Sequence, residues 1–111
     1  MSNQLVSDAD VERALDFLRD NAAEAARAKA ERVFCEEYRK SVKALLMAEK
    51  VEESIGAQER FAYSHPTYLA HLEKLKAAVF EDERLRALRG AAEMKIEAWR
   101  TMGANYRSMK L

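Results

Sequence analysis

Apolar residues recur every three or four positions over most of the 111-residue chain, which is the spacing that a helix face requires. The pattern predicts a short first helix that begins after Ser7, an N-cap residue followed by acids, and ends near Asp20. Asn21, with Glu24 three residues later, resembles a second helix N-terminus. The stripe of the first helix comprises Val11, Ala14, Leu15 and Leu18, with Phe17 beside it.

A second, much longer helix is predicted from Ala22 to about Ile55, and Gly56 is expected to kink or end it. A short helical turn over residues 57–63 then leads to Pro66. The apolar positions of the long helix are Phe34, Tyr38, Val42, Leu45, Ala48, Val51 and Ile55.

The last helix begins at Pro66, the only proline of the chain, with Ser64 or His65 as its cap, and reaches Tyr106 or beyond. Its broad apolar face comprises Leu69, Leu72, Leu75, Val79, Leu85, Leu88, Ala92, Ile96, Trp99 and Tyr106. Two antiparallel helices of this length expose too much apolar surface for a monomer, even with the first helix across them. The sequence therefore predicts one all-α domain over residues 1–111, a short N-terminal helix plus a long antiparallel helical hairpin, in an oligomeric assembly.

Composition and charge limit the kinds of binding partner that we expect. Apolar residues make up 49%, as in a soluble protein with a core, and 19 Lys and Arg balance 19 Asp and Glu. This balance predicts neither a DNA or RNA polymer nor a membrane as partner. The charges are uneven, with five acids and two bases in residues 1–20 against seven bases and two acids in residues 84–111. The two ends either pair, within or between subunits, or flank an anion pocket, and pairing is the simpler interpretation.

Few residues point to chemistry. Cys35 is the only cysteine, which excludes an internal disulfide, favours a reducing compartment and predicts a buried thiol. His65 and His71 are six residues apart and project in different directions from a helix, so no metal site is expected. The sequence contains no nucleophile elbow, phosphate-binding loop or dinucleotide fingerprint. We therefore expect neither an enzyme nor a cofactor, and the absence of a leader or apolar span predicts a cytoplasmic protein.

The C-terminal helix carries the most suggestive cluster. Met94, Met102 and Met109 with Trp99 fit a core or a subunit interface. Arg100, Asn105 and Arg107 adjoin this group, and arginines beside an aromatic ring can stack on a base and hold phosphates. A nucleotide site and an intersubunit salt bridge both fit these residues.

Three short motifs resemble a family of small phage proteins. Residues 96–100 (I-E-A-W-R) with 104–107 (A-N-Y-R) resemble a C-terminal I-E-x-W-R…A-x-x-R pattern. Residues 57–60, shortly before the H-P-T-Y of 65–68, are similar to an A-x-x-R turn, and residues 14–18 (A-L-D-F-L) resemble an N-terminal A-L-x-Y-L. On these motifs the chain resembles the phage anti-CBASS protein 2 family, sponges for cyclic oligonucleotides.

The resemblance implies a helical protein that assembles into an interlocked homohexamer in the host bacterial cytoplasm. It implies that cyclic dinucleotides such as cyclic GMP–AMP, made by the bacterial defence, are sequestered without cleavage, so that the effector stays inactive. Cyclic trinucleotides are implied to occupy a separate set of pockets.

For a cyclic dinucleotide, Phe17 is expected to stack on a base, and Lys29 or Arg32, on the next helix, to hold a phosphate. The family pattern has a tyrosine where this chain has Phe17. Any hydrogen bond that the tyrosine hydroxyl makes is therefore absent here, while stacking is retained.

Three further arginines complete the expected ligand-binding residues. Arg60, at the turn that joins two helices, is placed to meet a trinucleotide phosphate beside free backbone N–H groups. Arg100 and Arg107 are the remaining candidates. The alternative is a helical phage structural or protein-binding adaptor without a nucleotide ligand; of the two, the sequence motifs favour the sponge.

Overall fold

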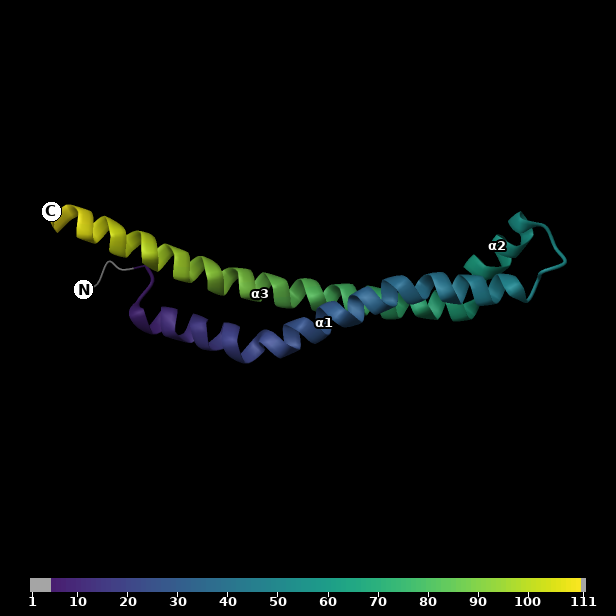
Figure 1. The fold of residues 1–111 in the computed structure, drawn as a ribbon, viewed down its shortest axis with the longest axis horizontal. Coiled ribbons are helices and arrows are strands. Elements are labelled where there is room, and N and C mark those ends of the chain that lie inside the picture. Colours follow the sequence, from purple (N-terminus) through teal and green to yellow (C-terminus); the bar gives the residue numbers. More distant parts are fainter. Residues whose placement is uncertain (1–4, 111) are drawn as a thin grey trace. The chain divides into compact units, whose positions relative to one another are not determined.

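The computed structural model describes residues 5–110, which form three helices and no strand (Figure 1). The helices are α1 (Asp8–Ala48), α2 (Ile55–Ser64) and α3 (Pro66–Lys110). The chain divides into two compact units, the first from the described residues within 1–25 and 84–111 and the second from residues 26–83. The predicted all-α class is confirmed, and no described helix has an apolar stretch sufficient to span a membrane.

The N-terminus of α1 is closed by reciprocal hydrogen bonds. The Asp10 N–H donates to Ser7 Oγ at 3.1 Å, and the Ser7 N–H donates to Asp10 Oδ2 at 2.9 Å. These bonds form a capping box, and the donated backbone N–H is the main cause that lowers the pKa of the Asp10 carboxyl. The predicted start of the first helix is confirmed.

The predicted break at Asp20 and Asn21 is wrong, because α1 runs without interruption through both residues. Asn21 is buried: its amide donates to Glu24 Oε2 at 3.1 Å and its Oδ1 accepts from Arg89 Nη1 at 3.2 Å. The residues that resembled a cap thus make a local pair and a contact with α3. With no glycine or proline to stop it, extending one helix costs less than starting another. The short helix of this fold is α2.

The connection between the long helices begins earlier in the chain than predicted. Helix α1 ends at Ala48, before the predicted end near Ile55, and residues 49–53 form hydrogen-bonded turns. Ser54 then caps α2, because its Oγ accepts the Ala57 N–H at 3.2 Å. The short helical turn predicted over residues 57–63 is confirmed as part of α2.

Helix α3 begins as predicted at Pro66, and His65 is the capping residue. The Thr67 N–H donates to His65 Nδ1 at 3.0 Å. The Ser64 hydroxyl instead donates to the Arg60 carbonyl at 2.6 Å, inside α2. Proline fits this position because the first turn of a helix needs no N–H donor there.

In the second unit, all three helices contribute to one small core. Val42 and Leu46 of α1, Ala62 of α2 and Tyr68 of α3 form a buried cluster. Met47, Phe61 and Leu72 pack against it. On the same unit, the His71 ring nitrogen Nε2 lies 2.7 Å from the Cys35 carbonyl oxygen, a hydrogen bond between α3 and α1.

In the first unit, α1 and α3 are joined by polar contacts and by a small apolar core. Arg89 Nη1 donates to the Leu18 carbonyl at 3.0 Å, and Trp99 Nε1 donates to Asp8 Oδ1 at 2.8 Å. A later residue of α3 meets an earlier residue of α1, so the two helices are antiparallel here. The buried apolar residues of this unit are Val6, Val11, Ala14, Leu85 and Ala92.

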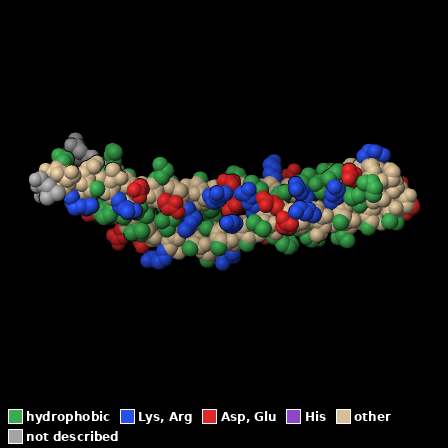
Figure 2. All heavy atoms as spheres, turned by 45° about the horizontal axis from the view of Figure 1, so that its top comes forward, with side chains coloured by type: hydrophobic (Ala, Val, Ile, Leu, Met, Phe, Trp, Pro, Cys, Tyr) green, Lys and Arg blue, Asp and Glu red, His purple; other side chains and the backbone are tan. Residues whose placement is uncertain are grey.

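The predicted apolar face of α1 is only partly the buried one. Cys35 is buried as predicted, and burial raises the pKa of its thiol, but Phe34, Tyr38 and Leu45 are exposed. Leu69 on α3 is likewise exposed rather than buried. Figure 2 shows hydrophobic side chains at many points of the visible surface.

Candidate functional site

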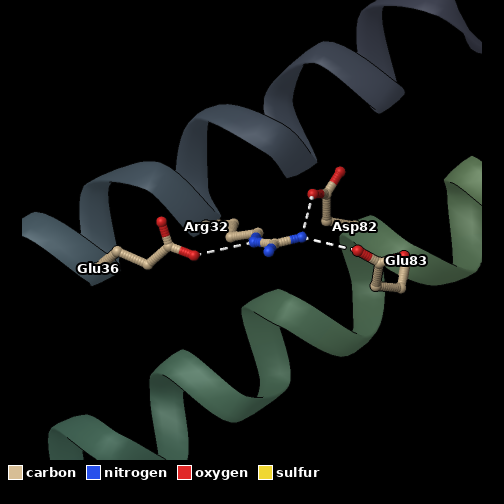
Figure 3. A network of polar contacts seen from close by, with 4 residues as sticks. All are labelled: Arg32, Glu36, Asp82 and Glu83. Atoms are coloured by element: carbon tan, nitrogen blue, oxygen red, sulfur yellow. Dashed lines mark hydrogen bonds and ion pairs between the residues drawn. The ribbon is translucent and has the colours of Figure 1, made fainter.

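Arg32 lies at the centre of a polar network that joins α1 to α3 in the second unit (Figure 3). Its Nε donates to Glu36 Oε1 at 3.0 Å. Its Nη1 donates to Asp82 Oδ2 at 3.1 Å and to Glu83 Oε1 at 2.8 Å. The Asp82 side chain is only 6% exposed, so Arg32 neutralises a carboxylate that has little access to water.

This network bears directly on the predicted phosphate contact of Arg32. The hydrogen bonds that Arg32 donates to three carboxylates raise the pKa of its guanidinium above its already high value. The three carboxylates around this single positive charge repel an incoming phosphate. Arg32 would have to leave these partners to bind one. The structure therefore gives Arg32 an intramolecular role that the sequence did not suggest.

The other two residues of the predicted dinucleotide pocket belong to different units. Phe17 is half-buried in the first unit, and Lys29 is exposed in the second. The expectation that Lys29 follows on the next helix is wrong, because both residues lie on the continuous helix α1.

Arg60 lies on the surface of α2. It is exposed and, with Gly56, Glu59, Tyr63 and Ser64, lines a hollow of about 680 Å³. The expected free N–H groups at the start of this helix are partly used, since Ser54 accepts the N–H of Ala57. All the lining residues belong to α2, so the hollow is an open recess on a single helix.

Arg100 and Arg107 are brought together, as the sequence suggested. With Trp99 they line a hollow of about 360 Å³ on α3; its other lining residues are Glu97, Thr101, Gly103 and Ala104. The Trp99 indole is held by its hydrogen bond to Asp8, and Arg100 Nη1 lies 3.4 Å from Glu97 Oε2 in a pair that is largely exposed. Such an exposed pair contributes little and is easily replaced by another anion.

Sequence reasoning missed the two buried polar residues of α3, Asp82 and His71. Asp82 follows Leu75 by seven residues and precedes Leu85 by three, so it falls on the apolar face of the helix. His71 follows Tyr68 by three residues and precedes Leu75 by four, so it falls on that face as well. A charged or polar residue at a core position is the signal that could have revealed them, because it needs a partner there.

Within the part of the chain that the structure describes, no group of three or more His, Cys, Asp or Glu side chains is arranged to hold a metal ion. No protein-family model, curated protein or solved structure matches this chain. What the motif resemblance to the sponge family implies for this chain therefore stays a prediction.

Proposed function

We propose that this chain is a helical protein-binding adaptor that associates with further copies of itself. One observation carries the proposal: sixteen large hydrophobic side chains are exposed, while no large side chain among the described residues is completely enclosed. The exposed group includes Phe34, Leu45, Phe80 and Met94. Burying such side chains against a partner contributes about 25 cal/mol per Å² of apolar surface. The small cores of a single chain leave this stabilisation unused.

The hollows of the surface support contact with a partner better than enclosure of a small ligand. Three of them are lined by residues of one helix each, on α1, α2 and α3 respectively. A small-molecule site normally surrounds its ligand with several elements. An open recess on one helix is better suited to receive a side chain from a neighbouring protein.

Multi-angle light scattering of the purified chain tests this proposal. We expect a mass of two or more copies at micromolar concentration, because the exposed apolar faces need a partner. Dilution should shift the mass downward, as it does for a reversible assembly. A monomer throughout the micromolar range would contradict the proposal.

The Trp99 hollow favours a second candidate, sequestration of cyclic oligonucleotides without cleavage. An aromatic ring and two guanidinium groups that line one hollow offer stacking for a base and charge-assisted hydrogen bonds for phosphates. A neighbouring subunit would supply the second wall of this nucleotide site, which fits the homohexamer that the motif resemblance implies. In this candidate the ligands are cyclic di- and trinucleotides, and the protein acts in the cytoplasm of a phage-infected bacterium.

Calorimetry against a panel of cyclic di- and trinucleotides tests this second candidate. We expect heat with at least one member, recovery of that ligand intact by chromatography, and a loss of about one to two decades in affinity for Arg100→Ala or Arg107→Ala. Arg39→Ala, at an exposed position of α1 in the other unit, is the matched control and should bind normally. Absence of heat with every ligand, or an equal loss in the control, would contradict specific binding at Trp99.

A further inference from the structure

In the second unit, α1 carries a largely exposed stripe of four residues, three of them apolar. Phe34, Tyr38 and Leu45 are 59%, 43% and 65% exposed, and Ser41 lies between the last two. The steps along the stripe are four, three and four residues, the spacing of a coiled-coil seam. The Phe34 and Tyr38 rings stack on each other, with centroids 5.5 Å apart and planes 12° apart.

Except for the edge of the Tyr38 ring, which contacts the His71 ring of α3 with centroids 5.5 Å apart, this stripe is separate from the face that packs within the unit. Phe34, Ser41 and Leu45 each immediately precede a buried residue, namely Cys35, Val42 and Leu46. Consecutive residues of an α-helix differ in direction by about 100°. Helix α1 therefore presents two faces at roughly a right angle, one buried in the unit and one exposed, as a helix does in a bundle where it packs on two neighbours.

The shape of the stripe indicates what would fit on it. Phe34, Tyr38 and Ser41 line a hollow of about 400 Å³ together with Glu37 and Lys40. Ser41 is the smallest residue of the stripe and leaves a gap beside the large Tyr38 ring. A knob from an opposing helix is needed there to restore close packing.

We propose that the occupant is α1 of a second copy, packed antiparallel so that Tyr38 of each copy lies against Ser41 of the other. The same register places Phe34 of each copy against Leu45 of the other, so all four positions of the stripe are matched. A parallel pair would instead set Tyr38 against Tyr38 and Ser41 against Ser41, which crowds one layer and leaves the other empty. This inference rests on the proposed self-association and names its interface.

Charge supports the antiparallel arrangement. Glu37 and Lys40 flank the stripe and form an ion pair of 3.2 Å within the helix, with both side chains about 70% exposed. In the antiparallel register, Glu37 of each copy lies near Lys40 of the other, so the pair is self-complementary about a two-fold axis. In a parallel pair, the Glu37 side chains lie on opposite sides of the seam, so no Glu37–Lys40 contact forms between the copies.

Two arginine substitutions on α1 test the surface. Leu45→Arg places a charge on the stripe, and Val33→Arg, at a residue 47% exposed outside the stripe spacing, is the matched control. We expect Leu45→Arg to weaken self-association at least tenfold in sedimentation equilibrium with unchanged helical circular dichroism, and Val33→Arg to associate like the wild type. If Leu45→Arg associates normally, this interface is wrong while self-association stands. A monomeric wild type would overturn both.

Disulfide trapping tests the orientation in a Cys35→Ser background, since Cys35 is the only native cysteine. Chains with Tyr38→Cys and chains with Ser41→Cys should form covalent dimers when mixed under mild oxidation, because these positions face each other. Neither variant should do so alone. Crosslinking of each variant with itself, without a covalent dimer between the two variants, would indicate a parallel pair and overturn the proposed register.

Discussion

Truncating Leu85 to alanine should lower the free energy of unfolding by about 2 to 4 kcal/mol. Leu85 lies on α3 in the first unit and is only 2% exposed, less than any other large apolar residue of the described cores. The substitution removes buried methyl groups and leaves a cavity that two rigid helices can close only in part. Urea denaturation followed by circular dichroism measures the change, at one protein concentration for all variants because association adds to apparent stability.

Leu88→Ala is the control for this prediction. Leu88 lies three residues further along the same helix but is 44% exposed, so the same truncation should cost well under half as much. Equal losses at the two positions would show that the packing of this unit is not as described. A larger loss at Leu88 would place that residue in an interface between chains.

Replacing Arg32 by methionine should lower the melting temperature by about 4 to 8 °C. Methionine keeps much of the apolar length of the side chain but leaves the nearly buried Asp82 carboxylate without its cation. An unpaired buried charge costs more than the original ion pair contributed. Calorimetry at neutral pH measures the shift.

A second variant separates the unpaired charge from a general loss of packing. The double variant Arg32→Met, Asp82→Asn should melt above Arg32→Met alone, because the second substitution removes the stranded charge. Arg39→Met, at an exposed position one heptad further along α1, should melt near the wild type. If the double variant is no more stable than the single one, the network of Figure 3 does not hold the helices as described.

The failure of the predicted break at Asn21 shows how a local signal is overridden. Asn21 and Glu24 have the spacing of a cap, and they do form a hydrogen bond, but inside a continuous helix. The Asn21 side-chain oxygen Oδ1 accepts from Arg89, which lies far away in the sequence. No inspection of neighbouring residues reveals that partner.

Among the candidate site residues, too, some contacts follow from local sequence and others do not. Arg100 and Arg107 are close together on one helix, so their shared hollow with Trp99 could be predicted from spacing alone. Arg32 could not be assigned in this way, because its partners Asp82 and Glu83 come from another helix. Its role as an ion-pair centre depends on how α1 and α3 meet.

The sequence by itself determined that this chain is all-α, that α1 starts after Ser7 and α3 at Pro66, and that apolar faces run along both long helices. These features follow from capping, proline geometry and the helical period, which act between residues a few positions apart. Only the tertiary structure decided which of the two apolar faces of α1 is buried. A helix rotates by about 100° per residue, so the stripe that includes Phe34 and the neighbouring one that includes Cys35 both follow the helical period. Contact with α3 buried the second and left the first exposed.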